Sequence, residues 1–151
     1  AVDWVSHNLY WTDSTYNWIA MTQLNDGVAY KVIVSHKLFT PYGIGVHPNT
    51  SSLFWTDSES GLLEKSDLKG GKRVIFIADE GATPTSLIVD GDRVYWLDVA
   101  TATLNSVGVN GHNRQVENSD PSLKFTVAFD LYKVGSFLLN KFLYMIIIIF
   151  Y

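Results

Sequence analysis

The chain has 151 residues, of which 47% are hydrophobic, 14% aromatic and 17% charged, and its formal net charge is −4. This length suits a domain with a sizeable core, and the hydrophobic fraction is too high for a disordered protein. A weakly acidic chain is not expected to bind nucleic acid, because phosphate binding normally requires a basic face. Since the chain has no cysteine, it can form no disulfide and offers no thiolate to a metal or a substrate.

A four-residue motif recurs along the chain at a nearly constant spacing. Its copies are Tyr10-Trp11-Thr12-Asp13, Phe54-Trp55-Thr56-Asp57 and Tyr95-Trp96-Leu97-Asp98. The motif tryptophans lie 44 and 41 residues apart, and Gly27, Gly70 and Gly111 keep the same phase. Independent markers that share one period indicate an internal repeat.

Within each period the residues favour short strands. β-Branched and aromatic residues dominate the runs at 9–12, 31–34, 53–56, 73–77 and 93–96. Residues that tolerate positive φ mark turns at 25–27, 69–71 and 110–111. No window has a helical period bounded by caps. Each period is therefore predicted to form four antiparallel strands, which in the second period cover 42–47, 52–56, 63–68 and 72–77.

A four-stranded unit of this length has the size of a propeller blade, which is about 40–45 residues. An isolated blade cannot bury both faces of its sheet, so blades must stack around an axis. The predicted fold class is all-β, a β-propeller of four-stranded antiparallel blades or a part of one. The repeat units would cover about 1–40, 41–83 and 84–120, with a degenerate fourth unit from 121.

The motif strand should present side chains to both neighbouring blades. Because side chains alternate along a strand, Tyr10 and Thr12 point to one face and Trp11 to the other, and both sets are expected to be buried. A buried polar group without a partner costs about 1–3 kcal/mol, so the motif carboxylates need donors. We interpret them as acceptors that fix blade spacing, the alternative being a metal or acid–base site: Asp13, Asp57 and Asp98.

The motif and its surroundings resemble the YWTD (class B) propeller repeats of the low-density-lipoprotein receptor family, which nidogen also contains. The resemblance extends over about residues 1–132 and includes Ala1-Val2-Asp3-Trp4 and the linking segment 41–46. Family propellers have six blades, so the resemblance implies about three and a half of them here. The chain departs from the family pattern at His47, at Leu97 and at Lys133-Val134-Gly135.

No catalytic or metal-binding spacing stands out. The histidines lack HExxH spacing and no GxSxG motif is present, so the chain is expected not to be an enzyme and to need no cofactor or metal. A propeller hydrolase with a metal in the central channel is an alternative, for which His47 and Asp90 are the polar candidates. His7 and His47 are expected to be solvated, and a pH-switch role for one histidine is the functional alternative.

One face of the propeller is predicted to bind a protein ligand. The loops that follow the motif strand and the loops that enter the next blade should share this face. Aromatic side chains beside charges are favourable anchors there, although each of them can also be a partly buried edge residue. The predicted face comprises Tyr16, Asn17, Trp18, Lys37, Phe39, Tyr42, Glu59 and Glu80.

Asn49-Thr50-Ser51 is an N-glycosylation sequon in a polar loop, which can also be a simple turn. The resemblance implies an extracellular or cell-surface module that binds a ligand or releases it on acidification. It also implies flanking EGF-like modules and a membrane attachment that belong to a parent protein. A nidogen-like matrix module that binds a laminin-type partner is the alternative.

The C-terminal residues 133–151 interrupt the repeat. From 137 to 151 only Asn140 and Lys141 are clearly polar, and a transmembrane helix needs about 20 apolar residues. A truncated or tail-anchor span, a strand pair completing a degenerate blade, and a non-native end of the coding sequence remain open. The last is favoured, so the tail is expected to lie outside the fold. The chain begins at Ala1 without a signal-peptide pattern and is interpreted as a fragment or a processed product.

Overall fold

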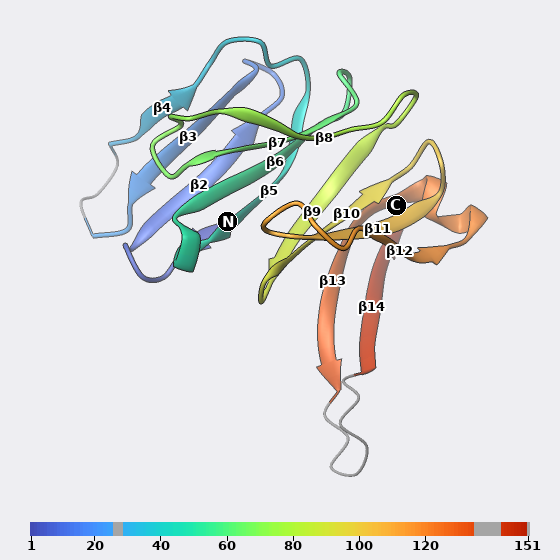
Figure 1. Ribbon diagram of the computed structural model, residues 1–151. Helices are drawn as coiled ribbons and strands as arrows, with labels where there is room; N and C mark the ends of the chain where they lie inside the picture. The colour runs from blue at the N-terminus through green and yellow to red at the C-terminus, as the bar shows by residue number, and fades with distance from the viewer. Residues whose placement is uncertain (26–28, 135–142, 151) are drawn as a thin grey trace.

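The computed structural model describes residues 1–25, 29–134 and 143–150, and in these ranges the chain forms three four-stranded antiparallel sheets and a two-stranded one (Figure 1). Blade 1 contains β1 (Val2–Asp3), β2 (Asn8–Asp13), β3 (Trp18–Gln23) and β4 (Lys31–Val34). Blade 2 contains β5 (Pro41–His47), β6 (Ser52–Asp57), β7 (Leu62–Asp67) and β8 (Val74–Ala78). Blade 3 contains β9 (Pro84–Asp90), β10 (Arg93–Asp98), β11 (Thr103–Gly108) and β12 (Gln115–Ser119).

In every blade the strands are paired in chain order, so each repeat is an antiparallel meander. This confirms the predicted four strands per repeat, and the strand boundaries in blade 2 differ from the prediction by one or two residues. Short 3-10 helices η1 (Pro48–Thr50) and η2 (Pro121–Phe125) follow β5 and precede β13 (Thr126–Val134). Within the described ranges, no helix has the length and apolar character that crossing a membrane requires.

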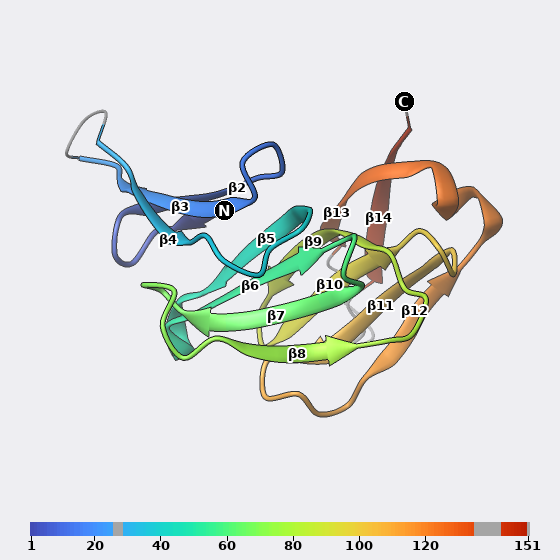
Figure 2. The ribbon, with the colours of Figure 1, turned by 90° about the horizontal axis from the view of Figure 1, so that it is seen from above.

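Consecutive blades pack face to face in chain order, with β5 of blade 2 beside β9 of blade 3 (Figure 2). Two hydrophobic clusters fill the spaces between consecutive blades. Tyr10 and Trp55 belong to the cluster between blades 1 and 2, whereas Phe54 and Trp96 belong to the cluster between blades 2 and 3. The first aromatic residue of the motif therefore faces the following blade, and the motif tryptophan faces the preceding one.

Burial of the motif differs between blades. All six residues of β6 and five of the six in β10 are buried, but in β2 only Tyr10 is. The expectation that both faces of every motif strand are buried is therefore wrong for blade 1. The reason is that no described segment covers the face of blade 1 that carries Trp11. This ring packs instead on Trp18 and Tyr30, at centroid distances of 6.3 and 5.7 Å.

Blades 2 and 3 approach closely where their innermost strands meet. A Cβ atom at Gly43 would lie 2.5 Å from the Leu87 nitrogen and 2.5 Å from the Thr85 oxygen, both of them backbone atoms. At Gly45 a Cβ would lie 2.7 Å from side-chain atoms of Leu87 and Val89. The two glycines therefore let two strands pack at short range.

Part of the hydrophobic tail is paired. Leu143–Phe150 forms β14, which lies antiparallel to β13 with Val134 opposite Leu143 and Thr126 opposite Phe150. A strand pair was among the three interpretations of this segment. Residues 137–142 and 151 lie outside the described residues, and the domain boundary at 132/133 stays a prediction.

Candidate partner-binding site

The loops of the predicted binding face gather at one end of blades 2 and 3. In the loop after β6, the Ser58 backbone nitrogen donates to the Thr40 carbonyl at 3.0 Å, and the Ser58 hydroxyl donates to the Pro84 carbonyl at 2.8 Å. The Thr40 hydroxyl donates in turn to Glu59 at 3.1 Å. The loop after the motif strand therefore contacts both the segment that enters blade 2 and the first residue of β9.

The motif carboxylates hold these segments in place. Asp57 accepts hydrogen bonds from the backbone nitrogens of Phe39 and Thr40 at 2.8 and 3.1 Å, and from that of Ser60 at 3.3 Å. Asp98 accepts from the equivalent segment, at the nitrogen of Thr83. Asp13 accepts only from its own turn, at the nitrogens of Thr15 and Tyr16, at 2.9 and 3.0 Å. The aspartates therefore act as acceptors, as predicted, but they bind turns and linkers.

Two of the hydrogen bonds between neighbouring blades come from the motif threonines. The Thr12 hydroxyl donates across the gap to the Tyr42 carbonyl at 2.6 Å, and the Thr56 hydroxyl donates to the Thr85 carbonyl. Thr56 also accepts from the Gly43 nitrogen at 2.8 Å. Of the motif's polar side chains, the threonines rather than the aspartates therefore bond to the neighbouring blade, which corrects our interpretation of the aspartates. In blade 3 this position is Leu97, whose side chain cannot donate.

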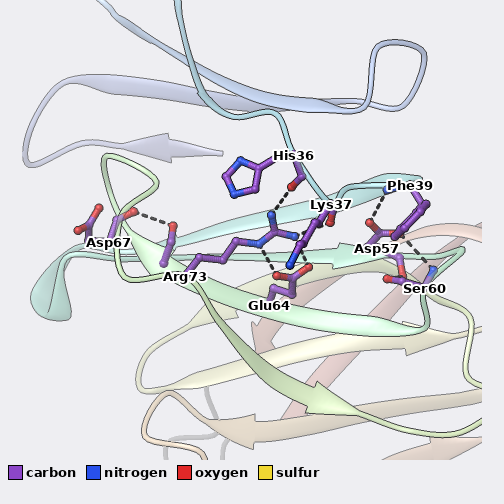
Figure 3. Close-up of polar contacts among 9 residues, drawn as sticks. His36, Lys37, Phe39, Asp57, Ser60, Glu64, Asp67 and Arg73 are labelled. Carbon is purple, nitrogen blue, oxygen red and sulfur yellow. Dashed lines mark hydrogen bonds and ion pairs between the residues drawn. The ribbon is translucent and has the colours of Figure 1, made fainter.

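Arg73 joins the outer part of blade 2 to the segment that arrives from blade 1 (Figure 3). Its guanidinium donates to both carboxylate oxygens of Glu64, at 2.5 and 2.7 Å. It also donates to the carbonyls of His36 and Lys37, at 2.5 and 2.7 Å. Since Glu64 is only 3% exposed, Arg73 supplies the opposite charge that a buried carboxylate needs.

Blade 3 has an equivalent arginine. Arg114 lies 5.2 Å from the Trp96 centroid and donates to both carboxylate oxygens of Asp79, in the segment between blades 2 and 3. These hydrogen bonds hold the pKa of Asp79 below its usual value and raise the pKa of Arg114.

A hollow of about 650 Å³ opens beside the Arg73 contact, between the segment that enters blade 2 and the outer strands β7 and β8. Its apolar residues include Phe39, Val74 and Ile75, which are 53, 52 and 61% exposed. We call it the Phe39 hollow, and it is lined by His36, Lys37, Phe39, Ser60, Leu62, Glu64, Arg73, Val74 and Ile75.

Only two residues of the predicted face, Lys37 and Phe39, line this hollow. Tyr42, Glu59 and Glu80 are exposed but do not line it. The predicted face did not include His36, Leu62, Val74 or Ile75, which also line the hollow. The β-branched run at 73–77 predicts a strand, but it does not tell which of its apolar side chains, such as Val74 and Ile75, are exposed.

The blade 1 residues of the predicted face lie elsewhere. Trp18 stacks on Tyr30 with centroids 5.5 Å apart and planes 4° from parallel, and Tyr16 stacks on Trp18 at 6.4 Å. Asn17 occupies the turn between them with a φ of 54°. These rings lie with Trp11 on the uncovered side of blade 1, and none of them lines the Phe39 hollow.

His47 is buried, contrary to expectation, whereas His7 is exposed. The turn formed by η1 brings the Thr50 hydroxyl to 2.7 Å from His47 Nδ1, and Asp92 Oδ1 lies 3.3 Å from Nε2. Both ring nitrogens therefore have partners within the protein. In the part of the chain that the structure describes, no group of three His, Asp or Glu residues is placed to hold a metal ion.

Comparisons with known proteins agree with the motif and the fold. Residues 51–90 match the family Low-density lipoprotein receptor repeat class B. Protein cueball of Drosophila erecta is 33% identical over 108 residues, which are 69% of this chain and 17% of that protein. The human low-density lipoprotein receptor-related protein 5-like protein is 28% identical over 118 residues, which are 76% of this chain and 46% of that protein.

Among solved structures, the crystal structure of the nidogen/laminin complex contains a chain that superposes with a TM-score of 0.74 at 25% identity. The match covers 79% of this chain and 46% of that one, so the chain spans less than half the length of each protein compared. The repeated motif, the four-stranded blades and these similarities agree. Residues 51–90 form a low-density lipoprotein receptor class B (YWTD) repeat, and the three four-stranded sheets of the chain resemble propeller blades.

Proposed function

We propose that the chain is part of an extracellular, non-enzymatic module that binds a protein ligand at the Phe39 hollow. The observation that carries this proposal is an apolar hollow of about 650 Å³ at the end of a class B repeat where the predicted binding loops gather. Exposed apolar side chains gathered in a concave site are typical of places where proteins bind partners.

The charges around the hollow favour an acidic partner segment. Glu64 is already paired with Arg73, so the exposed Lys37 leaves one positive charge in excess at the rim. A ligand with an apolar side chain next to an acidic one would fill the hollow and pair with Lys37. His36 lies at the same rim, beside Lys37 and the Arg73–Glu64 pair. Acid-dependent ligand release is part of the proposal, because acidification would protonate carboxylates of such a ligand and weaken their attraction to Lys37.

A matrix role is the second candidate. It is supported by the similarity to the nidogen chain in the nidogen/laminin complex. In this case the partner would be a laminin-type protein. In both cases, flanking EGF-like modules and any membrane attachment would belong to the parent protein.

Binding of two purified probes to the immobilised full chain tests both candidates. Low-density lipoprotein particles represent the receptor type, and laminin represents the matrix type. We expect one probe to bind, and Phe39→Ala or Lys37→Glu to weaken this binding at least tenfold. Lys124→Glu, an equal charge change at an exposed residue of η2, is the matched control and should leave binding unchanged.

Two results would contradict the proposal. One is a folded chain that binds neither probe, and the other is binding that all three variants weaken equally. Circular dichroism of each variant shows whether it has kept the wild-type fold before binding is compared.

A further inference from the structure

Asn49 belongs to the sequon Asn49-Thr50-Ser51, which occurs once in the 151 residues. It lies in η1, between β5 and β6, and is exposed. The Thr50 hydroxyl is engaged by His47 Nδ1 at 2.7 Å and donates to the Ser52 hydroxyl at 3.0 Å. The Thr50 hydroxyl is therefore engaged within the protein, although Asn49, Thr50 and Ser51 are all exposed.

A second hollow, of about 440 Å³, lies next to this asparagine. It is formed where the β1–β2, β5–β6 and β9–β10 turns of three blades meet. Trp4 is 72% exposed and Val2 is 53% exposed at its wall. We call it the Trp4 hollow, and it is lined by Val2, Trp4, Val46, His47, Pro48, Asn49, Val89, Gly91 and Asp92.

The two hollows lie at opposite ends of blade 2. Because successive strands of a meander run in opposite directions, successive turns alternate between its ends. β6 begins at Ser52, beside Thr50, and ends at Asp57, which binds the backbone of Phe39. A group attached to Asn49 would therefore leave the Phe39 hollow open.

We propose that Asn49 carries an N-linked glycan whose first sugar packs in the Trp4 hollow against the Trp4 ring. Exposure of the Trp4 ring to water is unfavourable, and a sugar packed against the ring with its apolar face would reduce the exposed apolar area. With a glycan at this end of the blades, the opposite end stays free to bind a partner. This inference rests on the extracellular placement in the proposed function, because N-glycans are added in the secretory route.

The modification is a simple group transfer by the host's transferase. The Asn49 side-chain nitrogen attacks C1 of the first N-acetylglucosamine of a lipid-pyrophosphate-linked oligosaccharide. The new N–C1 bond replaces the C1–O bond to pyrophosphate, the amide loses one proton, and the lipid pyrophosphate leaves. No oxidant or reductant takes part.

Translation of the full chain behind a cleavable signal sequence, in the presence of microsomes, tests the attachment. We expect a protease-protected product with the mobility shift of one glycan, which peptide N-glycosidase removes with conversion of Asn49 to Asp. Asn49→Gln and Ser51→Ala should abolish the shift, and Ser51→Thr, which preserves the sequon, should retain it. Protected wild-type chain without a shift would overturn the proposal.

This result is independent of the ligand. An unshifted but protected chain that binds laminin or lipoprotein would overturn the glycan and leave the proposed function standing. A shifted chain that binds neither laminin nor lipoprotein would support the glycan and overturn the proposed function.

Hydroxyl-radical footprinting of the glycosylated full chain tests the packing. Oxidation of the peptide that contains Trp4 should be several-fold slower than in Asn49→Gln protein. Oxidation at Phe39, at the opposite end, should be equal in the two proteins. Equal oxidation at Trp4 would overturn the packing of the sugar on this ring.

Discussion

The guanidinium of Arg73 lies 5.5 Å from the centroid of the Trp55 ring. The relationship recurs in blade 3, where Arg114 covers Trp96 at 5.2 Å, and in blade 1, where Tyr30 takes the place of arginine on Trp11 at 5.7 Å. In the sequence, the contacting residue stands three positions after a glycine that recurs in each repeat: Gly27, Gly70 and Gly111. The motif tryptophan is therefore contacted by the residue that directly precedes the outer strand of its own blade.

Replacement of Arg73 should lower the free energy of unfolding, because it leaves a buried carboxylate without a partner of opposite charge. Arg73→Ala leaves Glu64, which is 3% exposed, without its partner, and breaking such a pair costs about 3–5 kcal/mol. We expect urea unfolding to show a loss near the lower end of that range. The double variant Arg73→Met/Glu64→Gln should recover much of it, and Lys72→Ala, at an exposed neighbour, should change little. Equal losses in the single and double variants would contradict the explanation.

Gly43→Ala tests the close approach of blades 2 and 3. The added Cβ would meet backbone atoms at 2.5 Å, which no rotamer change relieves, so we expect a loss of about 3 kcal/mol or more in thermal unfolding. Gly91→Ala is the control, because nothing lies within 4 Å of a Cβ there and only its φ of 54° opposes the change. Its cost should be about 1–2 kcal/mol. A smaller effect at Gly43 than at Gly91 would disprove the close packing.

Thr56→Val tests the bond between blades. The valine keeps the volume but leaves the Thr85 carbonyl and the Gly43 nitrogen without this hydroxyl, so the free energy of unfolding should fall by about 1–3 kcal/mol. Thr56→Ser, which keeps the hydroxyl, should lower the free energy of unfolding by less. Thr12→Val should also lower it by less, because Thr12 is only half-buried. Chemical denaturation of the three variants ranks them, and the reverse order would contradict the assignment.

Acid should weaken the contact between Asp79 and Arg114. The hydrogen bonds from Arg114 lower the pKa of Asp79 in the folded protein. The stability from this pair is therefore fully present above the unfolded pKa of about 4 and is lost as the pH falls through the folded value. Both side chains are substantially exposed, so the pair should contribute no more than about 1 kcal/mol. The stabilities of wild type and Asp79→Asn should differ at pH 7, and the difference should shrink as the pH falls below about 4; a constant difference would contradict this.

The uncovered side of blade 1 should cause self-association. Tyr30 is 58% exposed there and stacks with Trp18, so burial between two chains would remove apolar surface from water. We expect the full chain to aggregate or associate with concentration in sedimentation velocity, and Tyr30→Lys to reduce this. The control is Phe125→Lys, at a residue of η2 that is 74% exposed. A wild-type chain that stays monomeric and unfolds cooperatively would contradict the prediction.

Much of the fold could be predicted from local patterns. Alternation of side chains placed Tyr10 and Trp11 on opposite faces, and turn residues located the hairpins, because both signals act over a few neighbouring residues. The Phe39 hollow could not be found in this way. Arg73 and the carbonyl of His36 that it binds are 37 residues apart, and their contact depends on how one blade is rotated against the next.

The sequence by itself determined the repeat, the four strands of each blade and the need to stack sheets, since these follow from spacing and apolar patterning. Only the tertiary structure decided that Thr12 and Thr56 bind across the blades and that His47 is buried under η1. It also decided that Phe39 and Asn49 lie at opposite ends of a blade next to separate hollows. These outcomes depend on the distance and rotation between whole sheets, which the burial of Trp55 and Trp96 and the absence of Cβ atoms at Gly43 and Gly45 set together.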